Sequence, residues 1–207
     1  MIKQIASELV RHAPFTALGA ATGIIIIVII IFGNALPQVS QVSHTVFYIF
    51  HPLHVILSAV VTTAIYKKHG KGKIWLAILI GYTGSIGIAT ISDSVIPYLG
   101  EMLLDLPNRG AHIGFIEEWQ IVNPVALIGI AIGYWKPTTK FPHFGHVLIS
   151  TWASLFHIIM ALGTIVDVIT LLVIFLFLFL AVWTPCCLSD IIYPLLFTGK
   201  SLPPQKI

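Results

Sequence analysis

Residues Ile24–Phe32 read IIIIVIIIF, a run without a single polar side-chain atom. We expect this run to face lipid, because a small soluble fold cannot cover it. The whole chain has the same character: 57% of its 207 residues are hydrophobic, 9% are charged, and its mean hydropathy is +0.96. A soluble domain carries about 25% charged residues. The sequence therefore predicts an all-α polytopic membrane protein, with the lipid bilayer as its solvent.

Apolar windows long enough to approach the width of the hydrocarbon core recur along the chain. They predict six transmembrane helices at Phe15–Phe32, Phe50–Tyr66, Ile74–Tyr98, Ile121–Trp135, Val147–Ile165 and Val168–Trp183. The fourth window is short, which fits a partly unwound helix or a locally thinned bilayer.

Basic residues indicate the orientation of these spans. In the six-span arrangement ten of the eleven basic residues fall on one side of the membrane, and only Arg109 falls on the other. The positive-inside rule places the Lys/Arg-rich side in the cytoplasm. We therefore expect an integral, multi-pass membrane protein with cytoplasmic N- and C-termini.

Three short phrases occur twice, in the same order. Pro-x4-Gly-x3-Gly begins at Pro14 and at Pro124, and Ser-Asp-x3-Pro-x-Leu begins at Ser92 and at Ser189. The third phrase is HPLHVILS from His51, which returns as HFGHVLIS from His143. The repetition predicts two three-helix repeats, residues 1–110 and 111–207. Since each repeat has an odd number of spans, the second should be inverted with respect to the first, as in many secondary transporters.

Histidine and aspartate are the candidate ligand residues of both repeats. Two histidines three positions apart lie on one face of a helix. An aspartate inside a span costs about 2.5–3.5 kcal/mol at the bilayer centre, so it should turn inward and find a partner. The predicted metal ligands are His51, His54 and Asp93 in the first repeat, and His143, His146 and Asp190 in the second. This donor set favours zinc, with iron or manganese as alternatives and copper less favoured.

The predicted topology places the first ligand set toward the outer leaflet and the second toward the cytoplasmic leaflet. Additional candidate ligands are His12, Glu117, Glu118 and His157. Structural interpretations stay open: the histidines can be interfacial, the aspartates can end helices before Pro97 and Pro194, and Glu117-Glu118 can favour a helix N-terminus. Cys186 and Cys187 offer soft ligands, but their position favours core packing.

These patterns favour a membrane transporter or channel for a divalent metal or another small cation. A metal-dependent intramembrane hydrolase acting on lipid or peptide, or a non-catalytic membrane subunit, remains as an alternative, so whether the chain is an enzyme stays open. We expect no nucleic-acid partner, and a six-span chain of this size is compatible with a homodimer.

Overall fold

The computed structural model describes residues 2–70, 73–137, 140–163, 166–187 and 192–198, with the backbone alone at 2–5, 7, 8, 11, 140–144 and 187. Helices account for nearly all of these residues, and no strand occurs among them. The predicted all-helical class is confirmed. In chain order the elements are α1 (Ile2–Phe32), α2 (Leu36–His69), α3 (Ile74–Thr90), the π-helical turn η1 (Ile91–Val95), α4 (Ile96–Leu103), α5 (Gly114–Glu117), α6 (Trp119–Trp135), α7 (Lys140–Ala161), α8 (Val168–Cys187) and α9 (Tyr193–Leu196).

Four segments of these helices are long and apolar enough to cross a membrane: His12–Phe32, Leu36–His69, Ile74–Leu103 and Val168–Cys186. The predicted fourth and fifth spans are also helical, but their apolar parts, Trp119–Trp135 and Gly145–Ala161, are shorter than a typical span. Large apolar side chains are exposed on the outer helix faces while histidines, serines and an aspartate are buried inside. That distribution is the one expected when lipid surrounds the bundle.

The isoleucine run does not face outward as a whole. Ile25, Ile29 and Phe32 are exposed, in agreement with the prediction, but Ile27 is fully buried. Ile27 belongs to a core cluster with Leu155 of α7 and Leu178 of α8. The reason is helical periodicity, because a run of apolar residues covers every face of a helix and one face must meet its neighbours.

Helix α2 begins at Leu36, well before the predicted start at Phe50. Pro37 lies in its first turn, where the missing N–H costs nothing. The polar residues that follow do not interrupt the helix: Ser43, for example, is buried and donates to the Val39 carbonyl. As a result His54 lies about midway along α2 and not near its entry.

The Ser-Asp phrase at Ser92 does not end its helix. The chain continues from α3 through η1 into α4, and Pro97 lies in the first turn of α4. Inserting one π-helical turn absorbs the backbone disturbance that the proline was expected to cause, and such turns are frequent at functional sites. The turn buries Ser92, Asp93 and Ser94 completely.

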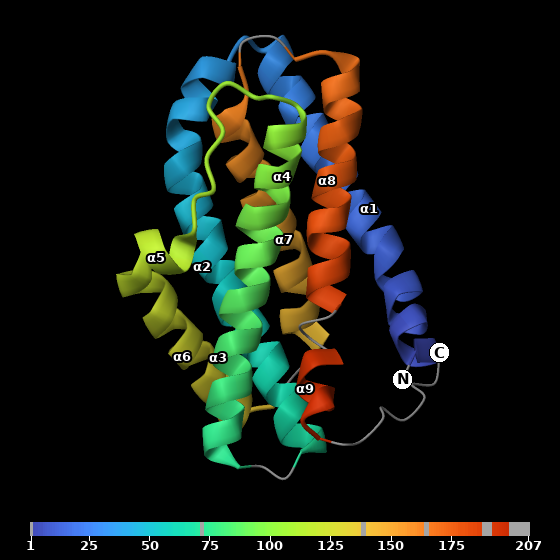
Figure 1. The fold of residues 1–207 in the computed structure, drawn as a ribbon, viewed down its shortest axis with the longest axis vertical. Coiled ribbons are helices and arrows are strands. Elements are labelled where there is room, and N and C mark those ends of the chain that lie inside the picture. Colours follow the sequence, from blue (N-terminus) through green and yellow to red (C-terminus); the bar gives the residue numbers. More distant parts are fainter. Residues whose placement is uncertain (1, 71–72, 138–139, 164–165, 188–191, 199–207) are drawn as a thin grey trace.

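The two helices that carry the histidine phrases, α2 and α7, pack against each other at the centre of the bundle. Helix α1 packs against α7 and α8, whereas α6 packs against α2 and α3. In Figure 1 the α2–α3 turn, α9 and the N-terminal end of α1 lie at the lower end, and the α1–α2 turn and the start of α8 lie at the upper end.

Glycines permit two of these helix contacts. A Cβ added to Gly129 would lie 2.5 Å from the Ile56 carbonyl oxygen, and one added to Gly133 would lie 2.5 Å from that of Val60. On the other side of the bundle Gly19 faces Thr151 of α7, and Gly23 faces Leu178 of α8 and, slightly farther away, Leu155 of α7. The backbones of α6 and α2 therefore approach as closely as small residues allow.

Replacing Gly129 by alanine should lower the thermal stability of the purified protein. The new methyl group meets backbone, which cannot rotate away, so we expect a cost of about 1–3 kcal/mol. Gly87→Ala on α3 is the matched control, because nothing lies within 4 Å of its Cβ position. Equal melting temperatures for the two variants in the same detergent would contradict the α2–α6 packing.

Candidate metal centre

Asp93 is the residue around which the buried polar side chains gather. Its Oδ2 lies 3.0 Å from Nδ1 of His51 and 2.8 Å from Nδ1 of His54. These histidines are three positions apart on α2, so both imidazoles project from one helix face. The three side chains are essentially inaccessible to solvent. His51, His54 and Asp93 thus lie together, and their role as metal ligands stays a prediction.

Two serines hold the other carboxylate oxygen. Ser92 of η1 and Ser150 of α7 each donate to Asp93 Oδ1 at 2.9 Å. Ser154 is also buried here, but it donates to the backbone carbonyls of Ser92 and Ser150. Asp93 therefore faces four donors, which is the environment of an ionised carboxylate, since that group only accepts hydrogen bonds.

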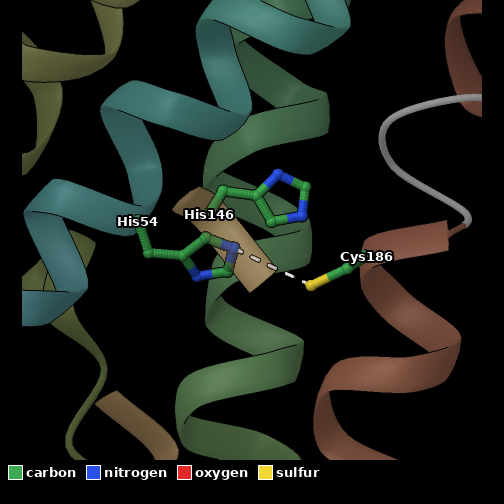
Figure 2. Close-up of side chains that lie close together, drawn as sticks. All are labelled: His54, His146 and Cys186. Atoms are coloured by element: carbon green, nitrogen blue, oxygen red, sulfur yellow. Dashed lines mark hydrogen bonds between the residues drawn. The ribbon is translucent and has the colours of Figure 1, made fainter. Parts of the chain in front are cut away.

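The carboxylate beside Nδ1 favours the tautomer of a neutral His54 ring in which Nδ1 carries the hydrogen and the lone pair lies on Nε2. Nε2 lies 4.0 Å from Sγ of Cys186 on α8. The ring of His146 on α7 lies 5.4 Å from the ring of His54. Figure 2 shows these three side chains, from three different helices, pointing toward one another.

We call His54, His146 and Cys186 the central group. One donor atom from each residue lies within 4.8 Å of the other two, and all three residues are buried. The separation suits a single ion placed between them. A carboxylate that accepts from the far nitrogen of a ligand histidine, as Asp93 does for His54, is a recurring feature of metal sites because it orients the ring and makes it more basic.

The structure corrects the predicted placement of the two ligand sets. They were expected near opposite membrane surfaces, but His54 and His146, which occupy equivalent positions in the two histidine phrases, are in contact. The error follows from the start of α2, since a helix that begins at Leu36 carries His54 to its middle. The side chain of His143 and all of Asp190 lie outside the described part of the structure.

His51 is placed behind the central group. It donates to Asp93, but its Nε2 has no hydrogen-bond partner among the described residues. Nε2 faces the start of α5, where a Cβ on Gly114 would lie 2.5 Å away. Its ring also stacks on Phe47 at 5.4 Å. In this arrangement His51 orients Asp93. Of the two histidines, only His54 directs its Nε2 toward the other members of the central group, His146 and Cys186.

Cys186 packs in the core, as expected, in a cluster with Val147 and Val182. Its sulfur also lies 4.0 Å from His54 Nε2 and 3.8 Å from the hydroxyl of Ser150, so it is a candidate ligand as well. The signal in the sequence is the interruption of an apolar span by Thr184-Pro185-Cys186-Cys187. Without knowing which helix faces α8, that signal does not distinguish a ligand from a packed thiol.

His157, the predicted intramembrane histidine, is fully buried and paired with Glu101 of α4. Its Nδ1 lies 2.7 Å from Glu101 Oε1, and its Nε2 lies 3.3 Å from the Ala111 carbonyl oxygen. Glu101 Oε2 accepts from the Gly110 N–H. Both ring nitrogens thus face oxygen atoms. The pair anchors the connection between α4 and α5.

The other predicted ligands are spread over the structure. Glu117 lies on α5, close to His44 and His112. Glu118 joins α5 to α6, where its backbone carbonyl accepts from the Ile121 and Val122 amides. His12 is buried on α1. In the described part of the chain neither Glu118 nor His12 belongs to a group with metal-ligand spacing.

Comparison of this chain with protein-family models, with curated proteins and with solved structures found no match. The donor atoms of the central group indicate which metal it can bind. Two imidazole nitrogens and one sulfur suit zinc, which takes nitrogen and sulfur ligands in tetrahedral geometry. Three protein donors leave one coordination position for water or for a further ligand.

Proposed function

We propose that this protein is a multi-pass membrane transporter or channel for a divalent metal ion, with zinc favoured as the cargo. The ion binds the central group, about midway along α2. The observation that carries this proposal is the contact between His54 and His146 beside Cys186, with Asp93 hydrogen-bonded behind His54. A site of this kind at the centre of a bundle binds a cation where lipid surrounds the protein on every side.

The proposal includes six spans in two inverted repeats. Its support comes from equivalent contacts: Gly19 and Gly23 of α1 meet Thr151 and Leu155 of α7, while Gly129 and Gly133 of α6 meet α2. In each case the first helix of one repeat packs on the second helix of the other. When halves are related by a two-fold axis, residues near the axis meet their equivalents, which is the relation between His54 and His146.

The orientation belongs to the same proposal. Lys67, Lys68 and Lys73 flank the α2–α3 turn at the lower end of the bundle in Figure 1, together with α9 and the N-terminal end of α1. By the positive-inside rule the lower end faces the cytoplasm. The two shorter apolar helices, α6 and α7, complete the six spans in this proposal, since local thinning of the bilayer accommodates a short span.

Hydrolysis is the alternative chemistry for three ligands with an open position. It needs a free general base beside the metal-bound water. Asp93 touches His54, but it already faces four donors. Glu101 is paired with His157. The described carboxylates near the polar interior are thus engaged, which favours binding and passage of the ion over catalysis.

The test is a flux assay with the purified full chain in liposomes that contain a zinc-sensitive dye. We expect saturable zinc entry well above that of protein-free liposomes, and competition by other divalent ions but not by potassium. Zinc entry equal to that of protein-free liposomes would reject the transport proposal, whether or not the protein binds metal. Release of fatty acid or peptide products during the assay would favour the hydrolase.

A further inference from the structure

A second set of metal-binding side chains lies in the upper half of the bundle. His44 of α2, His112 of the α4–α5 connection and Glu117 of α5 each place one donor atom within 4.8 Å of the others. We call them the upper group. The side chains of His112 and Glu117 are 28% and 43% exposed, unlike those of the buried central group.

The carboxylate of Glu117 is held in place by its neighbours. Oε2 accepts from the Tyr48 hydroxyl and lies 3.5 Å from His112 Nδ1, while Oε1 accepts from the Ile113 N–H at 3.1 Å. Glu117 is therefore an oxygen donor whose position is fixed by its neighbours.

His112 is fixed from the backbone. Its φ is +36°, in the left-handed region that residues with a side chain seldom adopt. Ser94, the residue after Asp93, donates to the His112 carbonyl oxygen at 2.9 Å and secures this conformation. The ring then lies 5.8 Å from the ring of His44. Local strain of this kind persists where the surrounding structure demands a particular side-chain position.

We infer that His44, His112 and Glu117 form a second divalent-cation site, distinct from the central group and more exposed than it. Two nitrogens and one oxygen suit zinc, manganese or iron, and the missing sulfur separates this site chemically from the central one. Phe47 lies between His44 and His54 along α2, where its ring stacks on His51 and meets the ring of His157 edge-on at 5.3 Å. The upper site exists whether or not the protein transports.

The same contacts have a simpler interpretation, in which His112 and Glu117 form a structural ion pair that holds the α4–α5 connection against α2 and binds no metal. The two interpretations differ in the role of His44. The structural ion pair does not need His44, whereas a metal site loses a ligand when His44 is removed. His44 is exposed, so its replacement leaves the packing of α2 intact.

Cobalt binding to the untagged full chain in detergent distinguishes the metal site from the structural ion pair. Co²⁺ is titrated into the purified protein, and both the stoichiometry and the thiolate-to-cobalt charge-transfer band are recorded. We expect two equivalents to bind in the wild type. His44→Ala and Glu117→Gln should each weaken one equivalent at least about tenfold and leave the charge-transfer band. His69→Ala is the matched control, because that α2 histidine bonds the Ile65 carbonyl away from both groups.

The outcomes also separate this inference from the proposed function. Unchanged binding in His44→Ala and Glu117→Gln would overturn the upper site, and so would a single equivalent that carries the charge-transfer band. A single equivalent that lacks the band and is lost in His44→Ala would support the upper site while rejecting the central one.

Discussion

Replacing His54 and His146 together by alanine is expected to abolish saturable zinc flux and to remove the metal of the central group. The variant loses both nitrogen donors and keeps one sulfur, which cannot hold a divalent ion alone. We expect zinc affinity at this site to fall by at least about a hundredfold, since even a hydrogen-bonded neighbour of a ligand is worth about 10–100-fold. The measurement is zinc flux in liposomes, together with metal content of the protein after gel filtration.

The single variants test the contribution of each histidine separately. His54→Ala and His146→Ala should each reduce flux to a similar extent, because the two residues occupy equivalent positions and their rings are in contact. His69→Ala should leave flux unchanged. A protein that keeps its metal and its flux without His54 and His146 would show that the buried histidines serve packing only.

Replacing Asp93 by alanine is expected to have the second largest effect. The carboxylate accepts from Nδ1 of His54, so its loss frees the ring to rotate and to place its proton on either nitrogen. We expect zinc affinity to fall about 10–100-fold, the usual cost of losing a carboxylate behind a ligand histidine. Isothermal titration of the metal-free protein measures the change.

Ser154→Ala is the matched control for Asp93→Ala. Ser154 is equally buried and lies in the same cluster, but it donates only to backbone carbonyls. We expect its removal to change stability by about 1 kcal/mol and to leave zinc affinity as it was. Equal loss of affinity in both variants would mean that the cluster acts through general packing and not through Asp93.

The sequence predicts much of the fold, because apolar windows and helical periodicity determine where helices form. It also predicts the partnership of His51 and His54 with Asp93, since a carboxylate inside an apolar segment must find donors. Helix starts are harder to predict. The mixed segment from Leu36 to Ile49 has too many polar residues for a hydropathy window, yet it forms continuous helix. Ser43 is buried and bonded to the backbone, while Gln38, Gln41, His44 and Thr45 are exposed on the helix surface.

The residue at which α2 begins determines the geometry of the central group. If α2 had begun at Phe50, His54 would lie near one surface and far from His146. Because α2 begins at Leu36, His54 lies at mid-helix and meets its equivalent. The positions of Cys186 and of the upper group beside other candidate ligands depend on contacts between segments that are distant in sequence. No local sequence pattern predicts which of these segments meet.

The most direct test of a metal bound between His54, His146 and Cys186 is the zinc X-ray absorption spectrum of the purified protein, recorded in the His44→Ala variant so that the upper site is empty. We predict nitrogen scatterers at about 2.0–2.1 Å and one sulfur at about 2.3 Å, with the sulfur lost in the further variant Cys186→Ser. A spectrum without sulfur, or one that Cys186→Ser leaves unchanged, would contradict the central site.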